Sequence, residues 1–479
     1  MCGIVILRGP RASSRIRESL ERIRHRGPDE LRITTGRDLA VGFARLAING
    51  HGPESSQPAI AGTLTGVING EIYNFRELQK TYDLPRSESD TAVLLPLVKK
   101  FGSAVIDVLD GFYAAAVIDG DSDDVLCLRD HIGKKPLFVG KAGTEYFVTS
   151  ELKATIGLEW FRPVPTGASV FNTVDGSLRP VRSHVLGRTF GSLAQCLEAA
   201  VLKRLPAIDQ KCGVFLSGGL DSSLVASFVA PAREDAVYFT LGGADSPDLQ
   251  AVRRLAVVLE LRDVRQIALP EVSELPELVA RVVVATESYN PSIVTNGLAT
   301  YLLGKAASEA GVKVVLTGEG ADEFFGGYHH FESSEPWRET REKLIADLPF
   351  TELRRLDLAT MAHSVEARCP FFDQAIRSLS DELEYEEFYS IGRNKVALRK
   401  LAAARLPNEI AERQKSSFDV GSGLRRLVVA YLRRNGRSER EELWDIWKQN
   451  FPWDGLDPYF SKYPVFDAAI DVRTSGHVP

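Results

Sequence analysis

The sequence predicts two domains of different class, an α+β domain followed by an α/β domain with a parallel sheet. At 479 residues the chain is longer than one hydrophobic core usually organises, so more than one domain is expected. Residues 1–185 alternate short apolar runs with turn residues, which is typical of antiparallel sheets. Residues 190–479 alternate helix-like segments with very apolar strands, which is typical of a parallel sheet.

The first domain is expected to place its strands where short apolar runs lie between Gly, Asp and Asn residues. Their spacing fits two stacked antiparallel sheets. Two longer stretches with helical periodicity, residues 14–24 and 90–101, interrupt these runs. The expected strands cover residues 39–48, 64–68, 112–118, 125–128 and 146–148.

The second domain is expected to follow a boundary at residues 179–190, after a stretch rich in proline and glycine. Its first helix is expected at residues 192–205. Very apolar strands separated by helices are buried on both faces and pair in parallel. The expected strands of this kind cover residues 212–216, 236–241 and 313–316.

Composition excludes several classes of protein. The 58 basic and 64 acidic residues nearly balance, and no basic block predicts a nucleic-acid partner. No apolar run approaches the roughly 20 residues that a membrane span needs. The five cysteines are scattered and form no CxxC pair. This pattern argues against a disulfide framework or a zinc site and predicts a reducing, cytoplasmic location.

Residue 2 is a cysteine, and removal of the initiator methionine would make it the first residue. Its α-amino group would then stand beside its thiol. A terminal amine has a pKa of about 7.7–8.0 and can accept the thiol proton, so one residue supplies both nucleophile and base. By itself, Cys2 before an apolar run is also typical of the start of a buried strand, and the later motifs decide between the two interpretations.

A segment with the residues of a phosphate-binding loop follows the strand at 212–216, and a helix is expected after it at 224–229. The two glycines let the backbone turn sharply and approach a ligand closely. Free amides at the helix start, joined by three hydroxyls, would face an anion. The carboxylate in the segment would repel a phosphate unless a divalent cation lay between them. The segment reads Ser217, Gly218, Gly219, Leu220, Asp221, Ser222 and Ser223.

Two further strand ends carry residues of the same kind. Leu241 precedes two glycines, and the strand at 313–316 precedes the segment from Thr317 to Glu323. Ligands of open α/β sheets bind at the carboxyl ends of strands, so the three strand ends are expected to line one crevice. Asp221 and Asp322 are the candidates to share a magnesium ion. The alternative for Asp322 is an acid that only caps a helix.

These motifs resemble those of the glutamine-hydrolysing asparagine synthetases. In the first half, the resemblance to a class II glutaminase, an N-terminal nucleophile domain with an αββα sandwich, rests on MCGI, RHRGPD (24–29), RLAI (45–48), NGEIYN (69–74), SESD (87–90), RDHIGKKPL (129–137) and SELKA (150–154). In the second half, the resemblance to an ATP-pyrophosphatase, an adenylating synthetase domain, rests on SGGLDSS, TGEGADEFFGGY (317–328), SVEARCPFFD (364–373) and RQKSSF (413–418).

The resemblance implies roles for residues of the first domain. The Cys2 thiolate would attack the side-chain amide of glutamine, and the Asn69 side chain with the Gly70 amide would form the oxyanion hole. Arg45 would bind the substrate α-carboxylate. Glu71 and Asp90 would hold its α-ammonium group.

In the second domain the resemblance implies adenylation of a carboxylic acid by ATP, with magnesium, and attack by ammonia that arrives through an internal tunnel. Glu319 would be the base that assists this attack, and Lys415 would stabilise the pyrophosphate. Leu241 and Gly318 would lie at the adenosine. Ser217, Gly218, Gly219, Asp221, Ser222 and Ser223 would hold the phosphates.

The chain departs from the family in the segment expected to recognise the acid. Family members have an aspartate, a threonine and an arginine where this chain has Asn290, Ile293 and Thr295. Loss of a guanidinium removes a bidentate partner for a carboxylate. The departure puts aspartate in question as the acid that is amidated.

The sequence therefore predicts a glutamine-dependent amide synthetase that uses ATP and magnesium, with aspartate as the default acid and asparagine as the product. The first alternative is the same machinery acting on another carboxylic acid in specialised metabolism. The second is a β-lactam-forming cyclase, against which the intact Cys2, Arg45, Asn69 and Asp90 argue. The third is a binding or scaffold protein. The expected partners are small molecules, and the sequence leaves a homodimer open.

Overall fold

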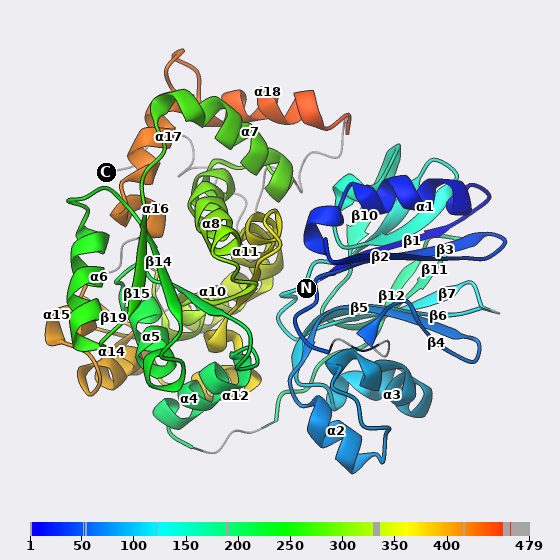
Figure 1. The fold of residues 1–479 in the computed structure, drawn as a ribbon, viewed down its shortest axis with the longest axis horizontal. Coiled ribbons are helices and arrows are strands. Elements are labelled where there is room, and N and C mark those ends of the chain that lie inside the picture. The colour runs from blue at the N-terminus through cyan, green and yellow to red at the C-terminus, as the bar shows by residue number, and fades with distance from the viewer. Residues whose placement is uncertain are drawn as a thin grey trace. The chain divides into compact units, whose positions relative to one another are not determined.

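The computed structural model describes residues 2–50, 52, 55–120, 122–187, 191–328, 336–414, 417–453 and 460. The chain divides into two compact units, one containing Met1–Val185 and the other Leu186–Pro452. Figure 1 shows the elements of each unit.

Two six-stranded sheets form the first unit, and every pairing between neighbouring strands is antiparallel. All five strands predicted for this unit are present. The first sheet has the order β10 (Leu158–Pro163), β8 (Phe138–Ala142), β9 (Glu145–Thr149), β1 (Cys2–Arg8), β3 (Leu39–Arg45) and β2 (Glu30–Thr35). The second has the order β12 (Leu178–Arg182), β11 (Gly167–Asn172), β7 (Asp124–Arg129), β6 (Gly111–Asp119), β5 (Leu64–Ile72) and β4 (Ala59–Ala61).

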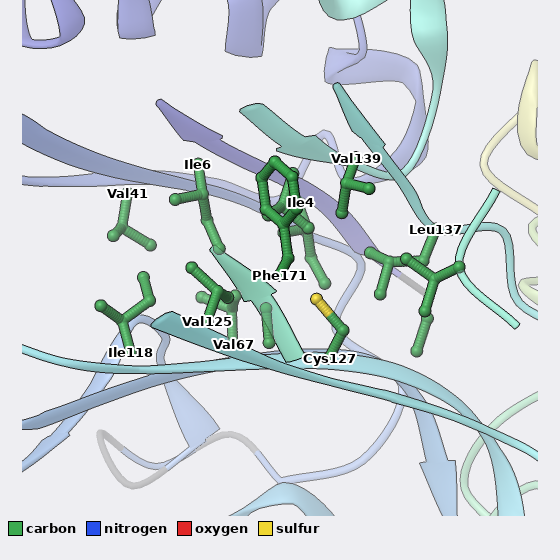
Figure 2. Packing of buried hydrophobic residues seen from close by; sticks show 14 of the residues in the cluster. Ile4, Ile6, Val41, Val67, Ile118, Val125, Cys127, Leu137, Val139 and Phe171 are labelled. Atoms are coloured by element: carbon green, nitrogen blue, oxygen red, sulfur yellow. The ribbon is translucent and has the colours of Figure 1, made fainter. Parts of the chain in front are cut away.

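Alternating residues of these strands build the core between the two sheets. In β1, Ile4 and Ile6 point into this core, and in β7 Cys127 meets them from the second sheet. Figure 2 shows Phe171 of β11 among these side chains. Because successive side chains of a strand point to opposite faces, β1 also offers a second apolar row, with Val5 and Leu7, to the outside of its sheet.

Helices cover both outer faces. Helix α1 (Ala12–Glu21) packs on β1 and β3, with Ile16 against the backbone of Gly42. On the second sheet, Ile68 packs in one cluster with residues of α2 (Phe75–Thr81) and α3 (Leu94–Phe101). Figure 1 shows α1 on one side of the two sheets and α2 and α3 on the other. The predicted αββα sandwich is confirmed.

The second unit contains a five-stranded sheet in which all pairings are parallel. Its order is β15 (Asp263–Ile267), β14 (Val237–Leu241), β13 (Cys212–Phe215), β16 (Val314–Leu316) and β17 (Glu366–Arg368). The three central strands are the predicted ones. The edge strands β15 and β17 were not predicted, because β15 is mostly polar and β17 has only three residues, two of them charged.

Helices connect these strands and continue after the sheet. None of the helices in the described ranges combines the length and the apolar character needed to cross a membrane. The helices are α4 (Leu193–Arg204), α5 (Leu220–Ala232), α6 (Pro247–Val258), α7 (Leu275–Thr286), α8 (Pro291–Glu309), α9 (Ala321–Phe325), α10 (Trp337–Asp347), α11 (Glu352–Met361), α12 (Gln374–Asp381), α13 (Tyr385–Phe388), α14 (Val396–Ala403), α15 (Asn408–Ala411), α16 (Phe418–Gly421), α17 (Leu424–Leu432) and α18 (Glu439–Asn450).

Three predicted helices differ in their bounds by two residues or more, and the one expected at 14–24 spans Ala12–Glu21. The helix expected at 224–229 begins at Leu220, so Asp221, Ser222 and Ser223 already lie in its first turn. The helix expected at 90–101 starts as a 3₁₀ turn at Asp90–Val93 and becomes α-helical at Leu94. Short polar side chains favour helix ends and turns, so apolar periodicity alone misplaces such starts.

A buried ion pair stabilises the second unit at the start of α12. Asp373 Oδ2 accepts hydrogen bonds from Lys203 Nζ and from Arg204 Nη1, each at 2.7 Å. Asp373 Oδ1 caps α12 by accepting from Ala375 N at 2.9 Å. The side chains of Arg204 and Asp373 are 1% and 3% exposed. Burial raises the pKa of Asp373, but the charges of Arg204 and Lys203 outweigh it, and the pKa lies below its ordinary value of 3.8.

Substitution Asp373→Asn is expected to lower the free energy of unfolding by about 3 kcal/mol at neutral pH, because it removes the charge of the buried carboxylate that pairs with Arg204 and Lys203. The amide oxygen can still cap α12. A lowered carboxyl pKa stabilises the fold above the unfolded pKa, so the difference should shrink as the pH falls below 3.8. Thermal unfolding of the wild-type protein and of the Asp373→Asn variant measures this difference in stability. Asp263→Asn, in an exposed pair with Arg265, is the control and should cost at most about 1 kcal/mol.

Candidate active sites

Cys2 lies at the start of β1 and is almost fully buried, in direct contact with Asn69 of β5. The Cys2 backbone N donates to Asn69 Oδ1 at 2.8 Å. The other polar atom of this amide, Asn69 Nδ2, is buried and has no hydrogen-bond partner in the part of the chain that the structure describes. A buried donor without a partner is costly, so a ligand oxygen that accepts from Nδ2 would be favoured.

Gly70 occupies a position that only glycine can fill. Its φ of +146° lies in a region that L side chains rarely adopt, and a Cβ would lie 2.1 Å from the carbonyl oxygen of Phe112. The glycine places its amide directly after Asn69. An amide and a side-chain N–H close to Cys2 have the composition of an oxyanion hole. The structure therefore brings together Cys2, Asn69 and Gly70.

The predicted glutamine-binding residues lie on neighbouring elements. Arg45 is the cross-strand partner of Cys2 in the β1–β3 ladder, and its guanidinium lies 3.5 Å from Glu30. Glu71 follows Gly70 in β5 and accepts from Asn49 Nδ2. Asp90 Oδ2 accepts from the backbone N of Ile72, one residue after Glu71. Asn49 was not predicted, although it directly follows the RLAI motif.

A second buried network supports the main chain of Cys2. Arg26 Nε donates to the Cys2 carbonyl oxygen at 3.0 Å, and Arg26 Nη1 donates to Glu151 Oε1 at 2.5 Å. His25 and Lys153 also contact Glu151, at 3.0 and 2.8 Å. Burial opposes ionisation of Glu151, but these cations hold its pKa well below the usual range. These residues belong to the RHRGPD and SELKA motifs, but no role was predicted for them.

In the second unit the turn between β13 and α5 has the geometry of an anion-binding loop. Gly218 has φ of +70°, and Gly219 stands at the start of α5. The Ser217 and Ser222 hydroxyls lie 3.0 Å apart, and Gly219 N donates to Ser217 Oγ at 3.3 Å. The amides at the start of this helix favour a negative group.

The loop after β16 lies directly against this turn. A Cβ on Gly318 would lie 2.7 Å from the backbone N of Ser222 and 2.9 Å from Asp221 Cβ. Only glycine allows the two segments to approach so closely. The carboxyl ends of β13 and β16 therefore meet at one place, as predicted.

Lys395, just before α14, joins the two predicted metal ligands. Its Nζ lies 2.6 Å from Asp221 Oδ2 and 2.6 Å from Asp322 Oδ1. The lysine is buried and adopts a left-handed backbone conformation with φ of +53°. Lys395 was not predicted as a site residue, because it lies in a stretch without a recognised motif. Next to Asp322, burial and then the Asp322 charge raise the pKa of Glu323 to about 7.

The two aspartates fit a magnesium ion that is also bound by phosphate. Magnesium prefers oxygen ligands and is commonly held by one or two carboxylates together with substrate phosphates. No group of three or more acidic, His or Cys side chains suited to a metal occurs among the described residues. A site with these two carboxylates would therefore depend on a nucleotide for its remaining ligands.

One cavity of about 620 Å³ connects these features. Of the predicted residues, it is lined by Ser217, Gly219, Asp221, Ser222, Gly318, Glu319 and Asp322. Gly218, Ser223 and Leu241 are not among the residues that line it, and Ser223 and Leu241 are fully buried. Lys415 lies outside the described residues. The predicted crevice therefore exists, but Gly218, Ser223 and Leu241 do not line it.

Another part of the cavity is formed by one face of α8, by α11 and by Glu319. Arg355 of α11 lies here and contacts Glu319 and Glu352 at 3.1 and 2.5 Å. Of the segment expected to recognise the acid, Ser292 lines the cavity. Asn290, Ile293 and Thr295 are instead buried and outside the lining, and Asn290 caps α8 by accepting from Ser292 N at 2.9 Å.

Known protein families match both units. The glutamine amidotransferase domain matches residues 1–172, and asparagine synthase matches residues 192–349 and 343–446. The asparagine synthetase [glutamine-hydrolyzing] of Zea mays is 32% identical, over 88% of this chain and 78% of its own length. Asparagine synthetase B [glutamine-hydrolyzing] of Escherichia coli is 31% identical, over 84% and 78%.

Solved structures are more distant. The allosteric regulatory enzyme of purine biosynthesis is 19% identical and covers 66% of this chain and 80% of its own, with a TM-score of 0.34. This value is too low to bear on the assignment. The two family matches cover most of the chain, and the relatives match over both units. The chain therefore belongs to the family of glutamine-hydrolysing asparagine synthetases.

Proposed function

We propose that this protein transfers the amide nitrogen of glutamine to a carboxylic acid that it activates with ATP. The observation that carries the proposal is the presence of two features in one chain. Cys2 contacts Asn69, and a separate cavity contains Asp221 and Asp322, which both contact the ammonium group of Lys395. The first fits an amidase, and the second fits a nucleotide-dependent synthetase. Family membership supports both assignments.

In the first reaction the Cys2 thiolate attacks the carboxamide carbon of glutamine. The carbonyl electrons move to oxygen, and Asn69 Nδ2 with the Gly70 amide donates to that oxygen. Ammonia leaves as a thioester forms, and water then releases glutamate. Arg45 binds the α-carboxylate of glutamine, and Glu71 and Asp90 its α-ammonium. After loss of Met1, the Cys2 amine would be held by Asn69 Oδ1, which in the structure accepts from the Cys2 backbone N.

In the second reaction an oxygen of the substrate carboxylate attacks the α-phosphorus of ATP, and pyrophosphate leaves. Ser217, Ser222 and the amides at the start of α5 bind the phosphates, and Lys395 balances their charge together with Lys415. Ammonia then attacks the acyl carbon of the mixed anhydride and displaces AMP, while Glu319 accepts a proton from the nitrogen. Gly218, Ser223 and Leu241 support the loop and the adenosine region from positions behind the cavity surface.

Asp221 and Asp322 are the residues that would hold magnesium. The ion would neutralise phosphate charge at the bond that breaks. By relation to the asparagine synthetases, aspartate, which would give asparagine, is the default acid and the first to test. The cytoplasm is the proposed location, because the chemistry needs a reduced Cys2 and intracellular ATP.

Incubation of the full chain with glutamine, magnesium ATP and a panel of carboxylic acids tests the proposal. With a suitable acid, mass spectrometry should detect an amide, AMP and pyrophosphate in equal amounts. Chelation of magnesium by EDTA should stop AMP formation and leave glutamate formation, because the metal serves only the second reaction. Release of ADP and phosphate in place of AMP and pyrophosphate would show that the carboxylate is activated in another way.

A further inference from the structure

The chemical class of the acid can be inferred from the part of the cavity bounded by α8, α11 and Glu319, which we call the acceptor region. Ser292, Asn296 and Thr300 recur every fourth residue, so they share one face of α8. Glu352 and Arg355, three residues apart, share one face of α11. The two helices pack against each other. Neutral hydroxyl and amide groups therefore face one acid–base cluster.

Arg355 is the cation of this cluster, and protein acceptors already occupy its guanidinium. Nε and Nη2 donate to Glu352 Oε2 at 2.9 and 2.5 Å. Nη2 also donates to Glu319 Oε1 at 3.1 Å, and Nη1 donates to Thr300 Oγ1 at 2.6 Å. Burial alone would lower the pKa of Arg355, but the negative charges of Glu352 and Glu319 have the larger effect and raise this pKa above its ordinary value. A substrate carboxylate would have to displace one of these carboxylates to form a bidentate pair.

The charges of the acceptor region do not balance. Glu319 and Glu352 contribute two negative charges against the single positive charge of Arg355. Arg425, another arginine of the cavity lining, faces the buried Asp419 at 3.6 Å. Among the described lining residues, the acceptor region therefore offers no guanidinium that is not already facing a carboxylate.

The remaining cations of the lining belong to the phosphate side. Lys395 lies between Asp221 and Asp322. Arg413 donates to the carbonyl oxygen of Ser217, in the phosphate loop, and to Asp248. Arg399 in turn donates to the carbonyl oxygen of Arg413. These groups are placed to offset the charge of ATP and leave the excess negative charge at Glu319 and Glu352.

The geometry points to an acid with one carboxylate, which is the one that reacts, and with an ammonium or a neutral hydrogen-bond donor at the end that faces Glu352. This inference rests on the proposed function. A second carboxylate would enter a partly shielded region of like charge, beside Glu319 and Glu352, which is unfavourable. An ammonium would instead form a charge-assisted hydrogen bond with Glu352. By this criterion aspartate, with its α-carboxylate, is a poor substrate.

Four small acids separate the two effects. β-Alanine is aspartate without its α-carboxylate, succinate is aspartate without its ammonium group, and propanoate lacks both. Pyrophosphate release with ATP, magnesium and ammonia gives kcat/KM for each acid. We expect β-alanine to exceed aspartate by at least about tenfold, and succinate to be the poorest, in keeping with discrimination by buried polar groups.

The outcomes distinguish this inference from the proposed function. A kcat/KM for aspartate equal to or above that for β-alanine overturns the inference and leaves the synthetase assignment intact. Failure of all four acids also overturns it if other acids of the wider panel support AMP formation. Failure of every acid in the wider panel removes the proposed function, and the inference with it.

Variants of Glu352 test the cause of the preference. Glu352→Gln removes the charge and should lower the ratio of β-alanine to aspartate kcat/KM by about tenfold, whereas Glu352→Asp keeps the charge and should largely preserve it. Glu339→Gln, on the exposed face of α10, is the matched control and should leave the ratio unchanged. A ratio that is the same in Glu352→Gln as in the wild type, or an equal loss with both acids, would contradict the assigned role of Glu352.

Discussion

Substitution Cys2→Ala is expected to abolish amide synthesis from glutamine and to leave synthesis from ammonia unchanged. The thiol is the only proposed nucleophile toward glutamine, and loss of a catalytic nucleophile lowers kcat by about 10³-fold or more. The cavity of the second unit contains none of the residues around Cys2, so ammonia supplied from solution can still attack the activated acid. Glutamate formation and AMP formation, measured in parallel with each nitrogen source, give the two rates.

The matched control is Cys196→Ala, a cysteine of α4 in the second unit that has no proposed catalytic role. It should leave both activities at wild-type level. The mass of the intact wild-type protein reports whether Met1 is removed, since only the processed chain has a free amine on Cys2. Equal loss of glutamine-driven and ammonia-driven synthesis in Cys2→Ala would contradict two separate active sites.

Substitution Lys395→Met is expected to stop AMP formation with glutamine and with ammonia alike. The variant removes the ammonium between Asp221 and Asp322 and leaves two carboxylates where the triphosphate is proposed to bind. Loss of one positioned charge at a reacting oxyanion costs about 10²-fold or more in kcat. Glutamine hydrolysis should persist, because it belongs to the first unit. Pyrophosphate release and glutamate formation are the two measurements.

Lys400→Met, on the exposed side of helix α14, which begins directly after Lys395, controls for the change of side chain. It should keep both activities. Thermal unfolding of Lys395→Met and wild type shows whether the variant keeps its fold. If a folded Lys395→Met protein forms AMP at the wild-type rate, Lys395 does not act on the phosphates and the proposed role fails.

Much of the fold could be predicted, because its core strands are marked by strong local patterns. Cys212–Phe215 is apolar throughout and buried throughout, and the alternation in β5 places Val67 and Ile68 on opposite faces of its sheet. Edge strands carry a weaker signal. Asp263–Ile267 is mostly polar, and it is a strand because β14 offers it hydrogen bonds. Tertiary pairing of this kind cannot be read from the segment itself.

The positions of the candidate site residues could be predicted where a motif combined glycine with a polar side chain. Asn69 with Gly70 and Asp221 with Gly218 are examples, since the glycine marks a close approach that the chemistry requires. Lys395 and Arg355 were missed because their roles come from residues distant in sequence. Arg355 donates hydrogen bonds to Glu319 and Thr300, which belong to other elements of the unit. In the sequence alone, such a residue is one of many charged residues, and nothing near it indicates its partners.

The bridge made by Lys395 also has a consequence for how the nucleotide enters. Two acidic groups held by one protonated amine form a site that is already occupied by its own counter-ion, so the vacant enzyme need not expose bare negative charge in a shielded place. Under the proposed function, the triphosphate would exchange these partners: the amine would turn toward the incoming anion, and the carboxylates would accept a divalent ion. Each charged group of the site would then have a partner of opposite charge both before and after the nucleotide binds.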